Sequence, residues 1–283
     1  AMSGPAMAVA IGWALHCPPL VLFSLVTVGY SSNALGGAGG PLAVLIIAIV
    51  AAELGKAVSK ETRVDILVTP LVTIFAGVGL SMLIAAPIGA AASQVGTLIM
   101  WATEQAPFLM GILVSVIVGV ALTLPISSAA ICAALGLTGL AGGAAVAGCC
   151  AQMIGFAVMS YKENGVGGLL AQGIGTSMLQ VPNIIRHPQI WIPEILSSAI
   201  LGPIAISRFV GMTNNATGSG MGTSGLVGQI MTWQTMTAVE SPVLVLIKIF
   251  LFHFILPGLL TLVFSEAMRK KNWIKSGDMK LSI

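Results

Sequence analysis

The sequence predicts an all-α fold, a polytopic transmembrane helical bundle, on three observations. Of 283 residues, 57% are hydrophobic and only 7% are charged, and the mean hydropathy is +1.01. Soluble domains carry about 25% charged residues, so this much apolar surface requires lipid as solvent. No charged residue precedes Glu53, and none lies between Glu104 and Lys162. The apolar runs over residues 42–52 and 110–124 are continuous rather than alternating, which favours helices over a membrane barrel.

The apolar runs predict the spans in order. Pro18 and Pro19 divide residues 7–31 into two helices, because proline removes a backbone donor and clashes with the preceding turn. Residues 33–41 are rich in glycine and predict a turn. Residues 87–104 predict either a surface amphipathic helix or a short crossing. The expected spans cover residues 41–58, 66–86, 107–124, 138–161, 190–206 and 242–264.

The basic residues predict the topology. By the positive-inside rule, the loop with Lys60 and Arg63 and the basic tail after residue 268 are cytoplasmic. The parity of crossings between residues 66 and 161 stays open. We expect one transmembrane domain over residues 1–283, and the abrupt apolar start predicts that the natural chain begins earlier. A weak internal repeat places Ser31-Ser32 before a glycine-rich stretch, as it does Ser127-Ser128, although chance similarity explains it equally well.

Two polar, glycine-rich stretches interrupt the apolar sequence. We name them the first segment (residues 164–183) and the second segment (residues 211–229). Irregular backbone persists at membrane depth only where protein buries it or water wets it. We therefore expect residues 166–183 to enter the membrane without crossing it as a plain helix. We expect the second segment to form a re-entrant hairpin or unwound loop that meets the first around a polar cavity. The alternative is that the glycines serve helix packing and the polar stretches are exterior loops.

Neutral amides and hydroxyls suit a polar, uncharged solute, and glycine lets the backbone approach it. Ionisable residues inside spans are a second source of candidates, namely Glu194, Lys248 and His253. The alternatives are that Glu194 sits at a helix N-terminus and that Lys248 pairs with Glu240. The predicted solute-binding residues are Gln172, Thr176, Gln180, Asn183, Glu194, Asn214, Asn215, Thr223, Ser224 and Gln229.

Catalytic and metal motifs are missing from the sequence. The four cysteines, at positions 17, 132, 149 and 150, form no C-x-x-C pair and lie in apolar text, so buried small hydrophobes are the expected role. The three histidines are too scattered for a metal site. We therefore expect no catalytic residues, no metal, no cofactor and no nucleic-acid partner.

Four stretches resemble a known family: MSYKENGVGGLLAQG at 159–173, GTSMLQVPN at 175–183, LPISSAA at 124–130 and GMGTSGLVGQ at 220–229. They are similar to the membrane-embedded IIC-type family of the bacterial phosphotransferase system. Within it, they resemble the branch that includes regulators of toxin production of the perfringolysin-regulator type. The resemblance implies a multi-pass protein of the bacterial inner membrane that has a transporter-like fold and forms a homodimer.

In the IIC transporters that the chain resembles, re-entrant hairpins with a glutamate and a histidine hold a sugar, which a IIB partner phosphorylates. The usual sugar-binding glutamate motif is not recognisable in this sequence. Glu194 and His187 are the nearest candidates, and the family roles are not carried over to them. The resemblance implies a cytoplasmic IIB-type partner, but it leaves open whether transport is coupled to phosphorylation.

Two functions follow from these expectations. The first is transport of a small polar solute, such as a sugar, across the lipid bilayer. The alternative is a membrane-embedded sensor or regulator that keeps a IIC-like fold and signals through a partner. An intramembrane enzyme fits least, because the sequence offers no paired nucleophile and base.

Overall fold

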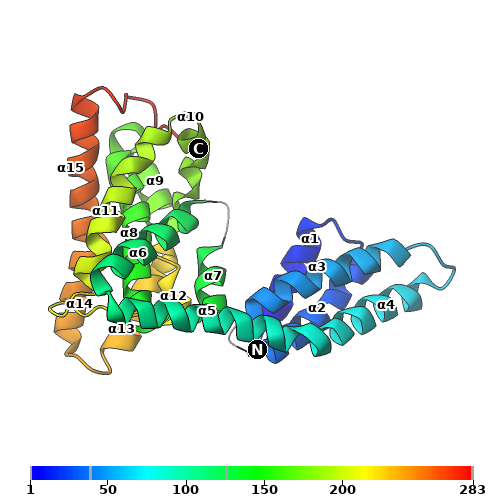
Figure 1. Ribbon diagram of the computed structural model, residues 1–283. Helices are drawn as coiled ribbons and strands as arrows, with labels where there is room; N and C mark the ends of the chain where they lie inside the picture. Colours follow the sequence, from blue (N-terminus) through cyan, green and yellow to red (C-terminus); the bar gives the residue numbers. More distant parts are fainter. Residues whose placement is uncertain (1, 38–39, 125–126, 282–283) are drawn as a thin grey trace. The chain divides into compact units, whose positions relative to one another are not determined.

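The computed structural model describes residues 2–37, 40–124 and 127–281, which are mostly helical (Figure 1). Within these residues the only β-pairing is a bridge between Gly139 and Asn214. The predicted all-α class is confirmed. The turn predicted over residues 33–41 is described only in part, and Pro125 and Ile126 lie outside the described residues.

Within the described residues, four helices have the length and apolar composition to cross a membrane: Gly40–Val58, Asp65–Gln105, Gly139–Met159 and Pro242–Lys270. The apolar helices Pro19–Leu35 and Pro107–Thr123 are shorter. The span predicted over residues 190–206 begins instead as a 3₁₀ turn, Pro188–Trp191, followed by a helix of only 14 residues. Pro193 explains this start, since proline fits the first turn of an α-helix but not its interior.

Packing divides the chain into two compact units: Ala1–Thr97 with Ala133–Gly136, and Leu98–Cys132 with Leu137–Ile283. The expectation of a single transmembrane domain stays a prediction. The first unit contains α1 (Ser3–Ala14), α2 (Pro19–Leu35), α3 (Gly40–Val58), α4 (Asp65–Leu80), a π-helical turn (Ser81–Ala85) and the start of α5 (Ala86–Gln105). The break between α1 and α2 falls at Pro18-Pro19, as predicted.

Small residues bring the helices of the first unit together. Its core is rich in alanine on α3, including Ala48, Ala51 and Ala52, all fully buried. Gly77 of α4 lies against Val28 of α2, where an added Cβ would collide with the valine side chain. Close approach through small residues is the usual way that helices associate when lipid surrounds them.

The second unit is built around α8 (Gly139–Met159), against which α6 (Pro107–Thr123), α11 (Ile192–Ala205) and α15 (Leu256–Lys270) pack. Most of α8, 89% of its apolar window, is buried, so this helix faces protein rather than lipid. Among the described residues this unit also contains α9 (Tyr161–Leu170), α10 (Val181–Arg186), α12 (Ala216–Ser219), α13 (Val227–Met236), α14 (Pro242–Phe250) and the first part of α7 (Ser128–Leu135), up to Cys132.

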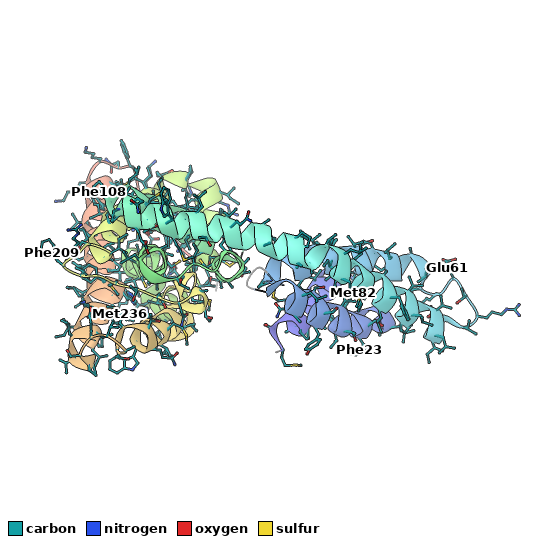
Figure 2. All side chains as sticks on the ribbon, turned by 60° about the horizontal axis from the view of Figure 1, so that its bottom comes forward. Phe23, Glu61, Met82, Phe108, Phe209 and Met236 are labelled. Carbon is teal, nitrogen blue, oxygen red and sulfur yellow. The ribbon has the colours of Figure 1, made fainter. Side chains whose placement is uncertain are left out.

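Large apolar side chains cover the outside of both units. Phe23 and Met82 in the first unit are 71% and 74% exposed, and Phe108 and Phe209 in the second are 73% and 97% exposed (Figure 2). Water would disfavour so many exposed apolar groups, whereas lipid accepts them. This surface agrees with the predicted multi-pass membrane protein.

Candidate functional site

The first segment is a chain of short, dissimilar turns rather than one helix. Gly165, at φ +58°, kinks α9. The helix ends in a π-helical turn, Ala171–Gly175, and a 3₁₀ turn, Ser177–Gln180, leads into α10. Between the two turns, Thr176 is extended, and its hydroxyl accepts the Met178 N–H at 3.1 Å. Residues 166–183 therefore do not form a plain helix, as predicted. Their re-entry into the membrane stays a prediction.

The amide side chains of this segment form a continuous chain. Gln172, fully buried, donates to the Ser160 hydroxyl at 2.9 Å and to the Gly168 carbonyl at 3.0 Å. Its oxygen accepts from Gln180 Nε2 at 2.8 Å, and Gln180 Oε1 accepts from Asn183 Nδ2 at 2.8 Å. The structure therefore brings these three predicted residues together, and their amide groups are engaged in hydrogen bonds within the protein.

The second segment is irregular and largely buried. Asn214 and Thr223 have no exposed surface, so these two do not belong to an exterior loop. Asn214 Nδ2 donates to the Gly228 carbonyl at 3.2 Å. Asn215 accepts the N–H groups of Thr217 and Gly218, at 3.1 and 3.0 Å, and so caps the short helix α12.

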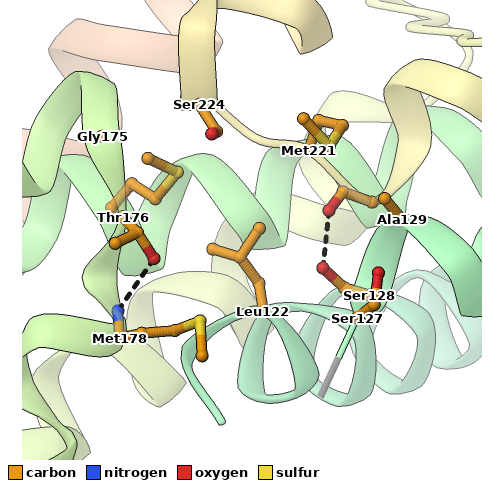
Figure 3. Close-up of a pocket in the computed structure, with 11 residues that line it drawn as sticks. Leu122, Ser127, Ser128, Ala129, Gly175, Thr176, Met178, Met221 and Ser224 are labelled. Atoms are coloured by element: carbon orange, nitrogen blue, oxygen red, sulfur yellow. Dashed lines mark hydrogen bonds between the residues drawn. The ribbon is translucent and has the colours of Figure 1, made fainter. Parts of the chain in front are cut away.

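The two segments meet in the second unit. The Thr223 hydroxyl donates to the Gly173 carbonyl at 2.5 Å. Beside this contact lies a cavity of about 350 Å³ (Figure 3). It is lined by Leu122, Ser127, Ser128, Ala129, Met153, Gly175, Thr176, Met178, Gly220, Met221 and Ser224.

The cavity combines neutral hydroxyls with an apolar wall. Thr176 and Ser224 reach it from the two glycine-rich segments, Ser128 reaches it from the first residue of α7, and Ser127 directly precedes that helix (Figure 3). The Ser128 hydroxyl donates to the Gly220 carbonyl at 2.7 Å. Among the described lining residues none is charged. The cavity therefore offers hydrogen bonds to an uncharged polar molecule that also has an apolar face.

Of the predicted solute-binding residues, Thr176 and Ser224 line this cavity and the others do not. Gln229 lies elsewhere, with Nε2 3.0 Å from His253 Nδ1. Leu122 of α6 and Met153 of α8 also line the cavity, and neither was predicted, because both look like ordinary core residues in the sequence. Ser127 and Ser128 belong to the weak repeat and to the family-like stretch 124–130, but they are not among the predicted solute-binding residues, although a polar pair in an apolar stretch is a usable signal.

Glu194 is placed in the first turn of α11 and is fully buried, but it does not cap the helix. Within the described residues neither carboxylate oxygen has a hydrogen-bond partner. Its side chain lies beside Gly155 of α8, where an added Cβ would be 3.1 Å from Glu194 Cγ. A buried carboxyl group without a partner is costly, so its presence points to a role other than stability.

Lys248 is engaged with Glu240, as one alternative predicted. Its ammonium group lies 2.7 Å from both carboxylate oxygens of Glu240 and 2.5 Å from the Val210 carbonyl. Glu240 precedes the start of α14 at Pro242, so the chain turns and the pair does not have to span one helix. This contact accounts for the charge of Lys248 without a ligand.

Comparison with known protein families gives a match over nearly the whole chain. The family model described as "Phosphotransferase system, EIIC" matches residues 1–281. No curated protein and no solved structure matches the chain.

Proposed function

We propose, on the premise that this chain belongs to the phosphotransferase system EIIC family, that it transports a small, uncharged polar solute such as a sugar. The chain is a multi-pass membrane protein by its helices and its apolar surface. The observation that supports the proposal is the cavity at which the two interrupted segments meet. Transporters typically bind solute where helices are discontinuous, because backbone groups are released there.

The chemistry of the cavity favours this class of solute. A volume of about 350 Å³ lies at the lower end of the range of small-molecule sites. The hydroxyls of Ser127, Thr176 and Ser224 are each able to donate and accept a hydrogen bond, as sugar hydroxyls require. Met178 and Met221 supply an adaptable apolar surface for the ring face.

Three further features belong to this proposal through the family. The protein resides in the bacterial inner membrane, acts as a homodimer, and meets a IIB-type protein on its cytoplasmic side. The family membership supports each of them, and none is needed for the solute to occupy the cavity.

Transport and binding assays test the proposal. Purified protein in vesicles is given a panel of radiolabelled hexoses, N-acetylhexosamines and polyols. We expect uptake or exchange of at least one, and Thr176→Val and Ser224→Ala should each weaken its binding by between about threefold and tenfold, because each loses a hydrogen bond. Thr235→Val is the matched control, since among the described residues that hydroxyl bonds only the Met231 carbonyl of its own helix.

The outcomes distinguish the proposed transporter from the alternative hypotheses. Binding that is unchanged in both cavity variants would place the solute elsewhere. Binding without flux, in vesicles that contain active protein, would favour the sensor or regulator over the transporter.

A further inference from the structure

The chain that follows α15 folds back onto the first segment. We name residues 272–281 the strap. Figure 1 shows it leaving the end of α15 and reaching α10. Two of its apolar side chains anchor it, since Ile274 and Met279 are 2% and 0% exposed and pack with Phe156 and Ile184.

Glu163, which directly precedes the first segment, and Asn164, which begins it, bind the backbone of the strap. Glu163 accepts the N–H groups of Gly277 at 3.2 Å and Met279 at 3.0 Å. Asn164 donates to the Met279 carbonyl at 2.9 Å and accepts the Leu281 N–H at 2.8 Å. Such paired contacts fix both the position and the direction of an extended chain.

Two further amides bind the strap from the other end of the first segment. Gln180 donates to the Met279 carbonyl at 3.0 Å, and Asn183 donates to the Lys280 carbonyl at 3.1 Å. The Met279 carbonyl therefore bonds both Asn164 and Gln180, which are the two ends of the interrupted stretch, residues 164–180. The strap closes this stretch into a loop whose two ends are both held.

The held stretch forms one wall of the cavity. The 3₁₀ turn Ser177–Gln180 ends at the residue that bonds the strap, and Met178 of this turn lines the cavity together with Thr176. Neither a π-helical turn nor a 3₁₀ turn is a strong structure on its own, because the hydrogen-bond geometry of short turns is poor. This wall needs support from outside itself.

We infer that the strap supplies that support, with Glu163 and Asn164 as positioning residues that hold Thr176 and Met178 in place at the cavity. The structural part of the inference stands on the contacts of the strap alone. Its effect on solute rests on the proposed function.

Hydrogen–deuterium exchange of the full chain in lipid nanodiscs tests the inference without any solute. Asn164→Ala removes one donor and one acceptor for the strap. We expect exchange to rise by between about threefold and tenfold in peptides covering residues 277–281 and also in those covering 171–181. Glu163→Gln, which keeps the side-chain shape, should act in the same direction.

Ser276→Ala is the control, because Ser276 is an exposed strap residue whose side chain makes no hydrogen bond within the described residues. Peptides from α8 should keep their protection in every variant, which shows that the fold is retained. Faster exchange confined to residues 277–281 would overturn the inference, because the wall would then be stable without the strap. Unchanged exchange in both stretches would overturn it as well.

A second measurement separates this inference from the proposed function. Binding of a radiolabelled hexose that the wild-type protein takes up should weaken by between about threefold and tenfold in Asn164→Ala. If exchange over residues 171–181 rises but hexose binding does not change, the strap does hold the wall and the hexose does not bind at this cavity.

Discussion

Two glutamates, Glu163 and Glu194, show how differently single residues contribute to this protein. The side chain of Glu163 is only 6% exposed, and it pairs with Arg269 at 3.2 Å besides accepting two backbone N–H groups of the strap. Glu194 is buried more completely, and neither of its oxygens has a partner within the described residues. The loss of water around the Glu163 carboxylate is offset by its ion pair and hydrogen bonds, whereas no such contact offsets the burial of Glu194 among the described residues.

Substitution of these glutamates should therefore change stability in opposite directions. Glu194→Met removes a buried polar group that has no partner, and we expect it to raise the free energy of unfolding by about 1–3 kcal/mol. Glu163→Met removes the carboxylate that pairs with Arg269 and accepts two backbone N–H groups, and should lower the free energy of unfolding by about 3–5 kcal/mol. Thermal or denaturant unfolding in detergent gives both values. Equal losses in the two variants would show that Glu194 has a stabilising partner.

At the scale of elements, α8 has glycines at the positions where other segments of the protein pack against it. Gly148 packs directly against the backbone carbonyl of Ser115 on α6, and Gly143 packs in the same way against the Met212 carbonyl. The contact of α8 with α11 is closed by Ser198, whose hydroxyl donates to the Gly148 carbonyl at 3.3 Å. The tight centre of the second unit thus requires residues without a side chain.

Gly148→Ala should destabilise the second unit by about 1–3 kcal/mol, because the new methyl group would overlap the Ser115 backbone and force α6 and α8 apart. Gly167→Ala on α9 is the matched control, since an added Cβ there meets nothing within 4 Å. It should be neutral or stabilising by up to about 1 kcal/mol, because alanine favours a helix. Denaturation midpoints of the two variants compare them directly, and equal midpoints would contradict the packing argument.

At the scale of the whole molecule, the arrangement in the membrane depends on the basic residues. Lys60 and Arg63 lie in the loop between α3 and α4, and Lys270 and Lys271 follow the apolar part of α15. These residues lie in different units, so the positive-inside rule is what relates them.

Cysteine labelling tests this topology. Thr62→Cys and Ser276→Cys, each placed in a Cys17→Ser background, should react with a membrane-impermeant maleimide from the same side of the membrane. Cys132, Cys149 and Cys150 are buried and should add little background. Inside-out vesicles should label both sites and right-side-out vesicles neither. Labelling from opposite sides would reject the predicted orientation.

The sequence by itself determined the all-α class, the apolar helices and the break at Pro18-Pro19, because hydropathy and proline geometry act locally along the chain. It also indicated that the first segment would not form a plain helix, since its density of glycine and amides is a local property. The resemblance of residues 159–183 and 220–229 pointed to the family that the match over residues 1–281 shows.

Only the tertiary structure decided which polar groups face the cavity. Gln180 finds an acceptor 99 residues away, at Met279, and Gln229 lies beside His253, 24 residues along the chain. Thr176 and Ser224 reach the cavity instead, beside Leu122 and Met153, which the sequence does not distinguish from core residues. A hydrogen bond depends on which groups meet in space. The composition of a segment gives its donors and acceptors, but it does not say which of them other parts of the fold already occupy.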